Sequence, residues 1–155
     1  MKDVIHHIES IQEHHKIMGH KNLKHPLMGI LRFEDAPVFS STEKVRFTMG
    51  FYAITMKKNY HCKSIYGQTS YDFDEGVMGF MAPRQVSSID ESFVSPESGW
   101  FLLIHPDFLA GSPLSRKIKA YDYFHYAVNE ALILSEDEER SIDDIFKNIQ
   151  QEYNR

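Results

Sequence analysis

Histidine is the residue type in this sequence with the widest chemistry, because a neutral imidazole binds metal ions and its proton exchanges near neutral pH. Six histidines lie within the first 25 residues: His6, His7, His14, His15, His20 and His25. Residues 3–18 carry apolar positions at helical spacing, and Gly19 suits a helix end. On a helix, His6 and His14 would be two turns, or about 12 Å, apart, so they cannot share an ion without further ligands. We expect solvated histidines on an exposed helix and no metal site.

A cysteine and two further histidines stand later in the chain. Cys62 is the single cysteine, and nothing places a base beside it, so we interpret it as a small semi-buried side chain rather than a nucleophile. His61 lies next to Cys62 instead of two residues from another histidine, and His105 stands alone on a later segment. Two isolated histidines fall short of the three or four ligands of a metal site. The sequence therefore predicts neither a metal nor a cofactor.

The elements that must position such residues begin with a predicted hairpin between Gly67 and Pro83. An aromatic strand at residues 71–73 leads into a turn in which Gly76 can adopt the positive φ that a tight turn needs. A second strand at residues 77–81 follows, and Pro83 ends it because proline has no N–H for a strand ladder. A short turn between two strands, followed by Phe-Met-Ala-Pro, resembles the central turn of a double-stranded β-helix, the jelly-roll barrel of cupins.

Further apolar segments predict more strands around this hairpin. Residues 26–39 predict a short strand and a loop. Residues 44–57 predict a long strand with a bulge or bend at Gly50, and both of its faces carry apolar side chains, so we expect both faces to be covered. Residues 100–104 form a continuous apolar run typical of a buried strand, and the polar residues 85–98 before it predict a loop.

The last third of the chain predicts helices. Ser112 followed by Pro113 is a suitable start for a helix through Lys119, and the aromatic residues within 121–126 are expected to pack on the barrel. Ser135 and Glu138 have the spacing of a capping box. An amphipathic helix is predicted behind this box, and its apolar positions are Ile142, Ile145, Phe146, Ile149 and Tyr153.

The composition places the chain among β-rich globular domains. Its 155 residues fit one domain with a helical appendage, and 42% are hydrophobic and 13% aromatic. A single cysteine excludes an internal disulfide framework and suits a reducing compartment. The first residues lack the apolar core of a signal peptide, and the longest apolar run is too short to span a bilayer. We expect a cytoplasmic domain that does not bind membranes.

Taken together, these segments resemble the amino-terminal half of AraC-type transcriptional regulators, in the version common in Bacteroidetes. The resemblance includes Gly-Trp-Phe-Leu-Leu-Ile-His-Pro-Asp-Phe-Leu at residues 99–109 and covers most of the chain. The other matching segments are residues 51–58, 66–68, 71–76, 83, 129–132, 134–135 and 148–153. In that family this half is a cupin-like barrel that senses a small molecule and helps dimerisation, while a carboxy-terminal pair of helix-turn-helix motifs reads DNA.

The resemblance implies a mainly β fold with α-helices: a cupin-like jelly-roll barrel with flanking helices, including an amphipathic C-terminal helix. The chain is then divided into an N-terminal helix and lead-in (1–25), the cupin-like barrel (26–106) and a helical appendage (107–155). The sequence departs from the family in one respect, because it contains no helix-turn-helix motif with a basic recognition helix. We expect the DNA-binding half beyond Arg155. The chain would then be a sensing and dimerisation domain that does no chemistry, binds a small-molecule effector and forms a homodimer in the full-length protein.

A barrel lined by aromatic residues would offer an apolar cavity with a few polar groups, suited to a sugar, an aromatic acid or another metabolite. The candidate ligand-binding residues are Tyr52, Tyr66, Tyr71, Phe80, Trp100 and His105. The alternative for each of them is a place in the core. Two other functions stay open: a metal-dependent cupin enzyme, such as a dioxygenase or isomerase, and a stand-alone cupin-like binding protein.

The charge balance predicts that this chain does not bind DNA on its own. With 17 basic and 22 acidic residues, its formal net charge is −5, which does not suit the neutralisation of phosphates. In a gel-shift assay at physiological salt, we expect no retained complex between this chain and a DNA fragment. Tight DNA binding would contradict the interpretation as a sensing domain only.

Overall fold

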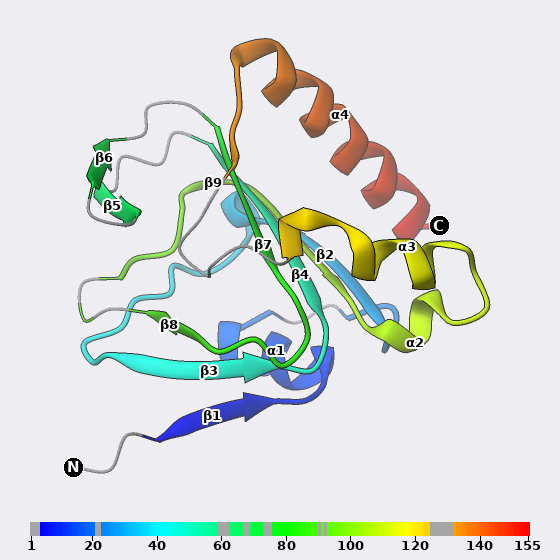
Figure 1. The fold of residues 1–155 in the computed structure, drawn as a ribbon, viewed down its shortest axis with the longest axis horizontal. Helices are drawn as coiled ribbons and strands as arrows, with labels where there is room; N and C mark the ends of the chain where they lie inside the picture. Colours follow the sequence, from blue (N-terminus) through cyan, green and yellow to red (C-terminus); the bar gives the residue numbers. More distant parts are fainter. Residues whose placement is uncertain are drawn as a thin grey trace.

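The protein is mainly β with flanking helices (Figure 1). The computed structural model describes residues 4–20, 23–58, 63–66, 69–72, 76–89, 91, 93–124 and 132–155, and for residues 63–66, 69–72 and 123 it describes the backbone. In chain order the elements are β1 (Ile5–Ile8), α1 (Ile11–Met18), β2 (Met28–Arg32), η1 (Phe33–Asp35), β3 (Val45–Met49), β4 (Tyr52–Lys58), β5 (Lys63–Tyr66), β6 (Thr69–Asp72), β7 (Val77–Met81), β8 (Ser87–Ile89), β9 (Ser98–Ile104), α2 (Pro106–Leu109), α3 (Leu114–Ala120), η2 (Asp122–Phe124), β10 (Leu132–Ile133) and α4 (Glu136–Tyr153).

The larger sheet, sheet B, has the strand order β10-β7-β4-β9-β2, and all of its pairs are antiparallel. Partners directly opposite each other point to the same face of a sheet. Gly29, Ala53 and Leu103 are in register and share one face, which packs on Ile11 of α1. We call it the α1 face. Trp100 lies on the opposite face, the α4 face, which the C-terminal elements cover.

Both faces of sheet B are covered, as the apolar residues on both sides of the strand at residues 44–57 predicted. In Figure 1, α1 and the smaller sheet lie on one side of sheet B, and α2, α3 and α4 lie on the other. On the α4 face, Met56 is fully buried, and on the α1 face Leu103 is fully buried. The described residues contain no helix that is long and apolar enough to cross a membrane.

The smaller sheet, sheet A, has the order β1-β3-β8, with β1 parallel and β8 antiparallel to β3. Because β3 belongs to sheet A and β4 to sheet B, the chain changes sheets between Met49 and Tyr52, which confirms the bend predicted at Gly50. The Gly50 N–H donates to the Ile8 carbonyl at 2.8 Å. A Cβ on Gly50 would lie 2.9 Å from the carbonyl oxygen of Glu9, so this close approach needs glycine.

The N-terminal helix predicted over residues 3–18 is wrong in its first half. Residues 5–8 form β1 instead, because they add a parallel strand to the edge of sheet A, an interaction that local spacing does not reveal. The helix begins only after Ser10, whose hydroxyl accepts the Glu13 N–H at 3.1 Å. It ends as predicted at Gly19, which has a φ of 76°.

The strand pairing of the predicted central hairpin is also wrong. The described strand β6 pairs with β5, whereas β7 pairs with β4 and β10, so residues 69–72 and 77–81 do not form one ladder. The predicted turn at residues 73–75 lies outside the described residues. Sequence proximity suggested a hairpin, but the buried α4 face of sheet B selects more distant partners for β7. The predicted end of β7 near Pro83 is confirmed.

Two details of the predicted loops and helices differ from the structure. The polar stretch predicted as a loop contains the short edge strand β8, which pairs with β3 although two of its residues are serines. Ser112 does not cap α3, because its hydroxyl donates to the Leu109 carbonyl at 2.6 Å and so closes the end of α2. The α3 helix begins beside Pro113 instead.

The predicted C-terminal helix α4 is confirmed with its capping box of Ser135 and Glu138. Phe146 is buried on the α4 face of sheet B, and Ile142, Ile149 and Tyr153 pack beside it. Ile145 does not join this stripe and is 53% exposed, because consecutive residues on a helix point about 100° apart.

One carboxylate fixes α4 to sheet B. Asp143 accepts the Trp100 indole N–H at 2.7 Å, and its oxygens lie 2.5 Å from the Lys58 ammonium and 2.9 Å from that of Lys147. The Trp100 ring stacks on Phe146 with centroids 5.6 Å apart. Burial alone would raise the pKa of Asp143, but hydrogen bonds from Lys58, Trp100 and Lys147 outweigh it and hold the pKa well below its usual range.

We expect Asp143→Asn to destabilise the protein by about 2 kcal/mol at neutral pH, because the charge-assisted bonds to both lysines are lost. The folded-state pKa lies below the ordinary value of 3.8, so this stabilisation is present above that pH and disappears as the pH falls further. Urea unfolding of both proteins at pH 7 and in acid measures the difference. Asp144→Asn, at the neighbouring exposed position, serves as the control and should change stability by less than about 0.5 kcal/mol.

Candidate functional site

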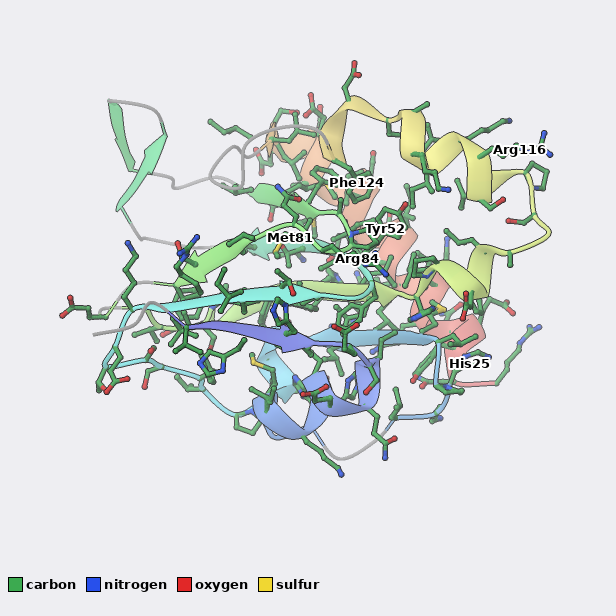
Figure 2. The ribbon with its side chains drawn as sticks, turned by 60° about the horizontal axis from the view of Figure 1, so that its bottom comes forward. His25, Tyr52, Met81, Arg84, Arg116 and Phe124 are labelled. Carbon is green, nitrogen blue, oxygen red and sulfur yellow. The ribbon has the colours of Figure 1, made fainter. Side chains whose placement is uncertain are left out.

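An open pocket of about 560 Å³ lies where the ends of several strands meet the helices of the α4 face. We call it the corner pocket, because the bend at Gly50 forms part of its wall. Its lining residues are Glu9, Gly50, Tyr52, Ala82, Pro83, Arg84, His105, Pro106, Asp107, Ile118, Lys119 and Phe124. Figure 2 shows Tyr52, Arg84 and Phe124 close together, with Arg116 away from them on α3. The pocket has the size and mixed lining typical of small-molecule sites.

The apolar part of the corner pocket is an aromatic cluster on the α4 face. The Tyr52 and Phe124 rings meet edge to face with centroids 5.0 Å apart, and Phe80 meets Phe124 at 5.6 Å. Ile118 of α3 is buried in the same cluster. Burial raises the pKa of Tyr52, so its hydroxyl stays protonated and can donate a hydrogen bond. The cluster can therefore hold an apolar ligand group and offer it one neutral donor.

His105 lies at the end of β9, where its side chain caps α2. Its Nδ1 accepts the Asp107 N–H at 3.1 Å. Since Nδ1 acts as the acceptor, this hydrogen bond assigns the proton of the neutral ring to Nε2. The Asp107 carboxylate lies 3.6 Å from Nδ1 and adds an acceptor to this side of the pocket. The pair presents one donor and one anionic acceptor to a ligand.

Arg84 follows the turn at Pro83 and has an unusual backbone. Its φ is 67°, and among the described residues it is the one non-glycine residue with positive φ. Its N–H donates to the Met49 carbonyl at 2.7 Å, which ties this turn to the end of β3. A non-glycine residue in this conformation costs on the order of 1 kcal/mol, and such strain concentrates at functional sites. The residue with this unusual backbone, Arg84, is thus part of the wall of the corner pocket.

The predicted solvent exposure of the N-terminal histidines is confirmed for His6, His7 and His25, of which His6 and His7 lie on β1 rather than on a helix, and it is wrong for His14 and His15. His14 and His15 are only 5% and 3% exposed. Ile11, His14 and His15 share one helical face, and this face packs against the α1 face of sheet B. The His14 ring lies 5.2 Å from Phe101 between centroids. Because Ile11, His14 and His15 have the i, i+3, i+4 spacing of one helical face, the sequence could have predicted that the two histidines are buried with Ile11.

Two imidazole nitrogens in this cluster have no hydrogen-bond partner: His14 Nδ1 and His15 Nε2. His14 and His20 line a cavity of about 10 Å³, which is room for about one water molecule. Burial, together with the nearby His15 and His20, lowers the pKa of His14 to about 3. Burial also lowers the pKa values of His15 and His20. Within the described ranges, no three His, Cys, Asp or Glu side chains come together as ligands for a metal.

The structure brings part of the predicted site together. Tyr52 and His105 line the corner pocket, and Phe80 packs behind it on Phe124. Trp100 lies farther along the same face, in the core beneath α4. The backbone places two more predicted residues, Tyr66 on β5 and Tyr71 on β6, in a separate two-stranded sheet, and their side chains lie outside the described part of the chain.

Sequence reasoning missed four charged residues of the pocket: Glu9, Arg84, Asp107 and Lys119. Local sequence offers no signal for Glu9 or Lys119, because distant segments bring them to the bend at Gly50. For Arg84 the signal was its position after Pro83 at the end of a strand. His61 and Cys62 lie outside the described residues.

Comparisons of this chain with protein-family models, curated proteins and solved structures find no match.

We expect the buried His14 to make the protein acid-sensitive. Between pH 6.5 and about 3, His14 is protonated in the unfolded chain but neutral in the folded protein. The free energy of unfolding therefore decreases as the pH is lowered through this window. The contribution is about 1.4 kcal/mol per pH unit. Urea unfolding at pH 7.5, 6 and 5 should show a weaker pH dependence for His14→Leu. The exposed His6→Gln should keep the wild-type dependence; equal slopes in all three proteins would contradict the prediction.

Proposed function

We propose that this chain is the effector-sensing and dimerisation domain of an AraC-type transcriptional regulator, and that the corner pocket is its ligand site. The observation that carries the proposal is the position of the pocket. Its walls come from the strand ends on one side and from α3 and η2 on the other. A ligand there would contact both the sheets and the helices that follow them.

The strand pairing supports the cupin-like barrel that the resemblance implies. A jelly roll is a chain of eight strands folded double and then rolled, so that the first strand pairs with the eighth, the second with the seventh, the third with the sixth and the fourth with the fifth. The ladders of β2 with β9, β3 with β8, β4 with β7 and β5 with β6 follow this scheme. When the folded chain is rolled into a barrel, strand pairs that are separate in the flat scheme come together, and the additional ladder of β4 with β9 is such a contact. These strands span residues 28–104, within the expected barrel of residues 26–106.

The filled interior favours the corner pocket over the inside of the barrel as the ligand site. Ile11 and His14 of α1 occupy the α1 face of sheet B, and the cavity beside His14 measures about 10 Å³. That volume holds a water molecule but no metabolite. The corner pocket, at about 560 Å³, has room for a small organic ligand.

The proposed mechanism is a shift between two packings of the helical segment. A ligand in the corner pocket would contact Tyr52 and Arg84 on the barrel side and Ile118 and Phe124 on the helix side. It would stabilise the packing in which these residues face each other, and its effect would equal its difference in affinity for the two packings. Moving the populations from 1:9 to 9:1 requires a difference of about 80-fold. No bond is made or broken in this scheme.

The regulatory part of the proposal rests on the resemblance. The DNA-binding half would follow Arg155, where α4 has ended at Tyr153. Reading the coding sequence downstream of Arg155 tests this part directly. Two helix-turn-helix units with basic second helices would support a regulator, whereas a stop codon would leave a binding protein without a DNA-binding half.

We expect a substitution that fills the corner pocket to abolish ligand binding. Ala82 lines the pocket, so Ala82→Leu places three additional carbons in it. A panel of sugars, amino acids and aromatic acids is screened by thermal shift, since a ligand that binds the folded state raises Tm. The shift given by a panel compound should be lost in Ala82→Leu and kept in Ala110→Leu, a control at an exposed position at the end of α2. An undiminished shift in Ala82→Leu would place the ligand elsewhere.

A further inference from the structure

Two opposite charges line the corner pocket without neutralising each other. Glu9 follows β1 and Arg84 follows the turn after β7, and both line the pocket. Among the ion pairs and side-chain hydrogen bonds of the described residues, none involves the Glu9 carboxylate or the Arg84 guanidinium. Both residues are exposed, and exposed charges gain little by pairing with each other because water screens them. The carboxylate and the guanidinium are therefore both available to a ligand in the pocket that contacts both.

The backbone holds both charges at the same corner of the fold. The Gly50 N–H donates to the Ile8 carbonyl, and a Cβ on Gly50 would lie 3.2 Å from the Glu9 carboxylate oxygen Oε2, so this carboxylate covers the glycine. Arg84 is bound through its own N–H to the carbonyl of Met49, the residue before Gly50. Two consecutive residues of the β3–β4 bend thus position a negative and a positive group.

The positive φ of Arg84 belongs to a β-turn over residues 82–85, which the Gln85 N–H closes by donating to the Ala82 carbonyl at 3.3 Å. The φ of 67° at Arg84 suits glycine or asparagine, which would form the same turn at lower cost. The N–H that ties this turn to Met49 belongs to the backbone, so any residue except proline could make that bond. The backbone of this turn therefore does not require arginine, and the guanidinium that arginine adds to the pocket wall can form paired bonds to a carboxylate.

We propose that the corner pocket binds a small zwitterion with an apolar body, of the α-amino acid class. This inference rests on the proposed function of the pocket as the ligand site. Arg84 would bind the carboxylate, Glu9 the ammonium group, and the edge-to-face pair of Tyr52 and Phe124 would contact the apolar side chain. The Nε2–H of His105 offers a further donor to the carboxylate.

The charge balance of the pocket favours a zwitterion over a simple anion or cation. Two carboxylates, Glu9 and Asp107, stand against two cations, Arg84 and Lys119. A ligand with a single charge would gain from one pair and be opposed by the other, whereas a zwitterion can be oriented by both. A sugar would use the donors but leave the two unpaired charges without a charged partner.

The test compares ligands that differ by one charged group. Isothermal titration of this chain uses phenylalanine, phenethylamine and 3-phenylpropionate, and a second series uses leucine, isopentylamine and 4-methylpentanoate. In at least one series we expect the amino acid to bind 10-fold or more tightly than either single-charge analogue, because each analogue leaves one pocket charge without its partner.

Three variants assign the charges to residues. Arg84→Asn removes the cation and keeps a residue that tolerates positive φ, and it should abolish the preference for the amino acid over the amine. Glu9→Gln should abolish the preference for the amino acid over the acid. Arg116→Gln, an exposed arginine of α3 outside the pocket, is the control and should leave both preferences unchanged.

The outcomes separate this inference from the proposed function. An acid or an amine that binds as tightly as the amino acid would overturn the zwitterion and leave a pocket for anions or cations. A sugar or aromatic acid whose binding is lost in Ala82→Leu, with no binding in either series, would overturn the zwitterion and support the ligand site. Absence of binding by every compound of the screening panel and of both series would overturn both.

Discussion

The buried carboxylate of Asp143 is the constraint on which the arrangement of the α4 face depends. Removing a carboxylate from water is unfavourable unless donors replace its hydration, and here Trp100, Lys58 and Lys147 do so. These donors come from β9, β4 and α4 itself, so the position of the helix on the sheet is specified by geometry as well as by apolar burial. With α4 fixed over Trp100, the shorter helices cover the rest of this face and leave the corner pocket at its edge.

The opposite face of sheet B is filled rather than hollow. The α1 helix inserts Ile11, His14 and His15 against it, and Gly29 makes room because a Cβ there would lie 2.9 Å from the His15 ring. Imidazoles in this position stay neutral, since burial opposes their protonation. The stability gained from packing thus depends on pH. The filled α1 face also leaves the open strand ends, at the bend of Gly50, as the place where a ligand can enter.

The corner pocket combines residues that no local pattern connects. Tyr52 and His105 were predicted as ligand-binding residues from their strand positions. They come together because Tyr52 of β4 lies opposite Ile104 of β9, the residue before His105. Glu9 could not be predicted and Arg84 had only its position after Pro83 as a signal, since each reaches the pocket through hydrogen bonds of the backbone around Gly50. Trp100 was predicted as a ligand-binding residue on the same grounds of strand position and chemistry, but its indole N–H donates to Asp143 and helps to fix α4.

The sequence by itself determined the features that depend on neighbouring residues: the capping box of α4, the helix end at Gly19, the bend at Gly50 and the buried strand around Trp100. These follow from steric limits and hydrogen bonds within a few residues. Only the tertiary structure decided that residues 5–8 form a strand, that β7 pairs with β4 rather than β6, and that His14 is buried. The free energy of each of these choices comes from partners far away in the chain, so the local pattern does not contain it.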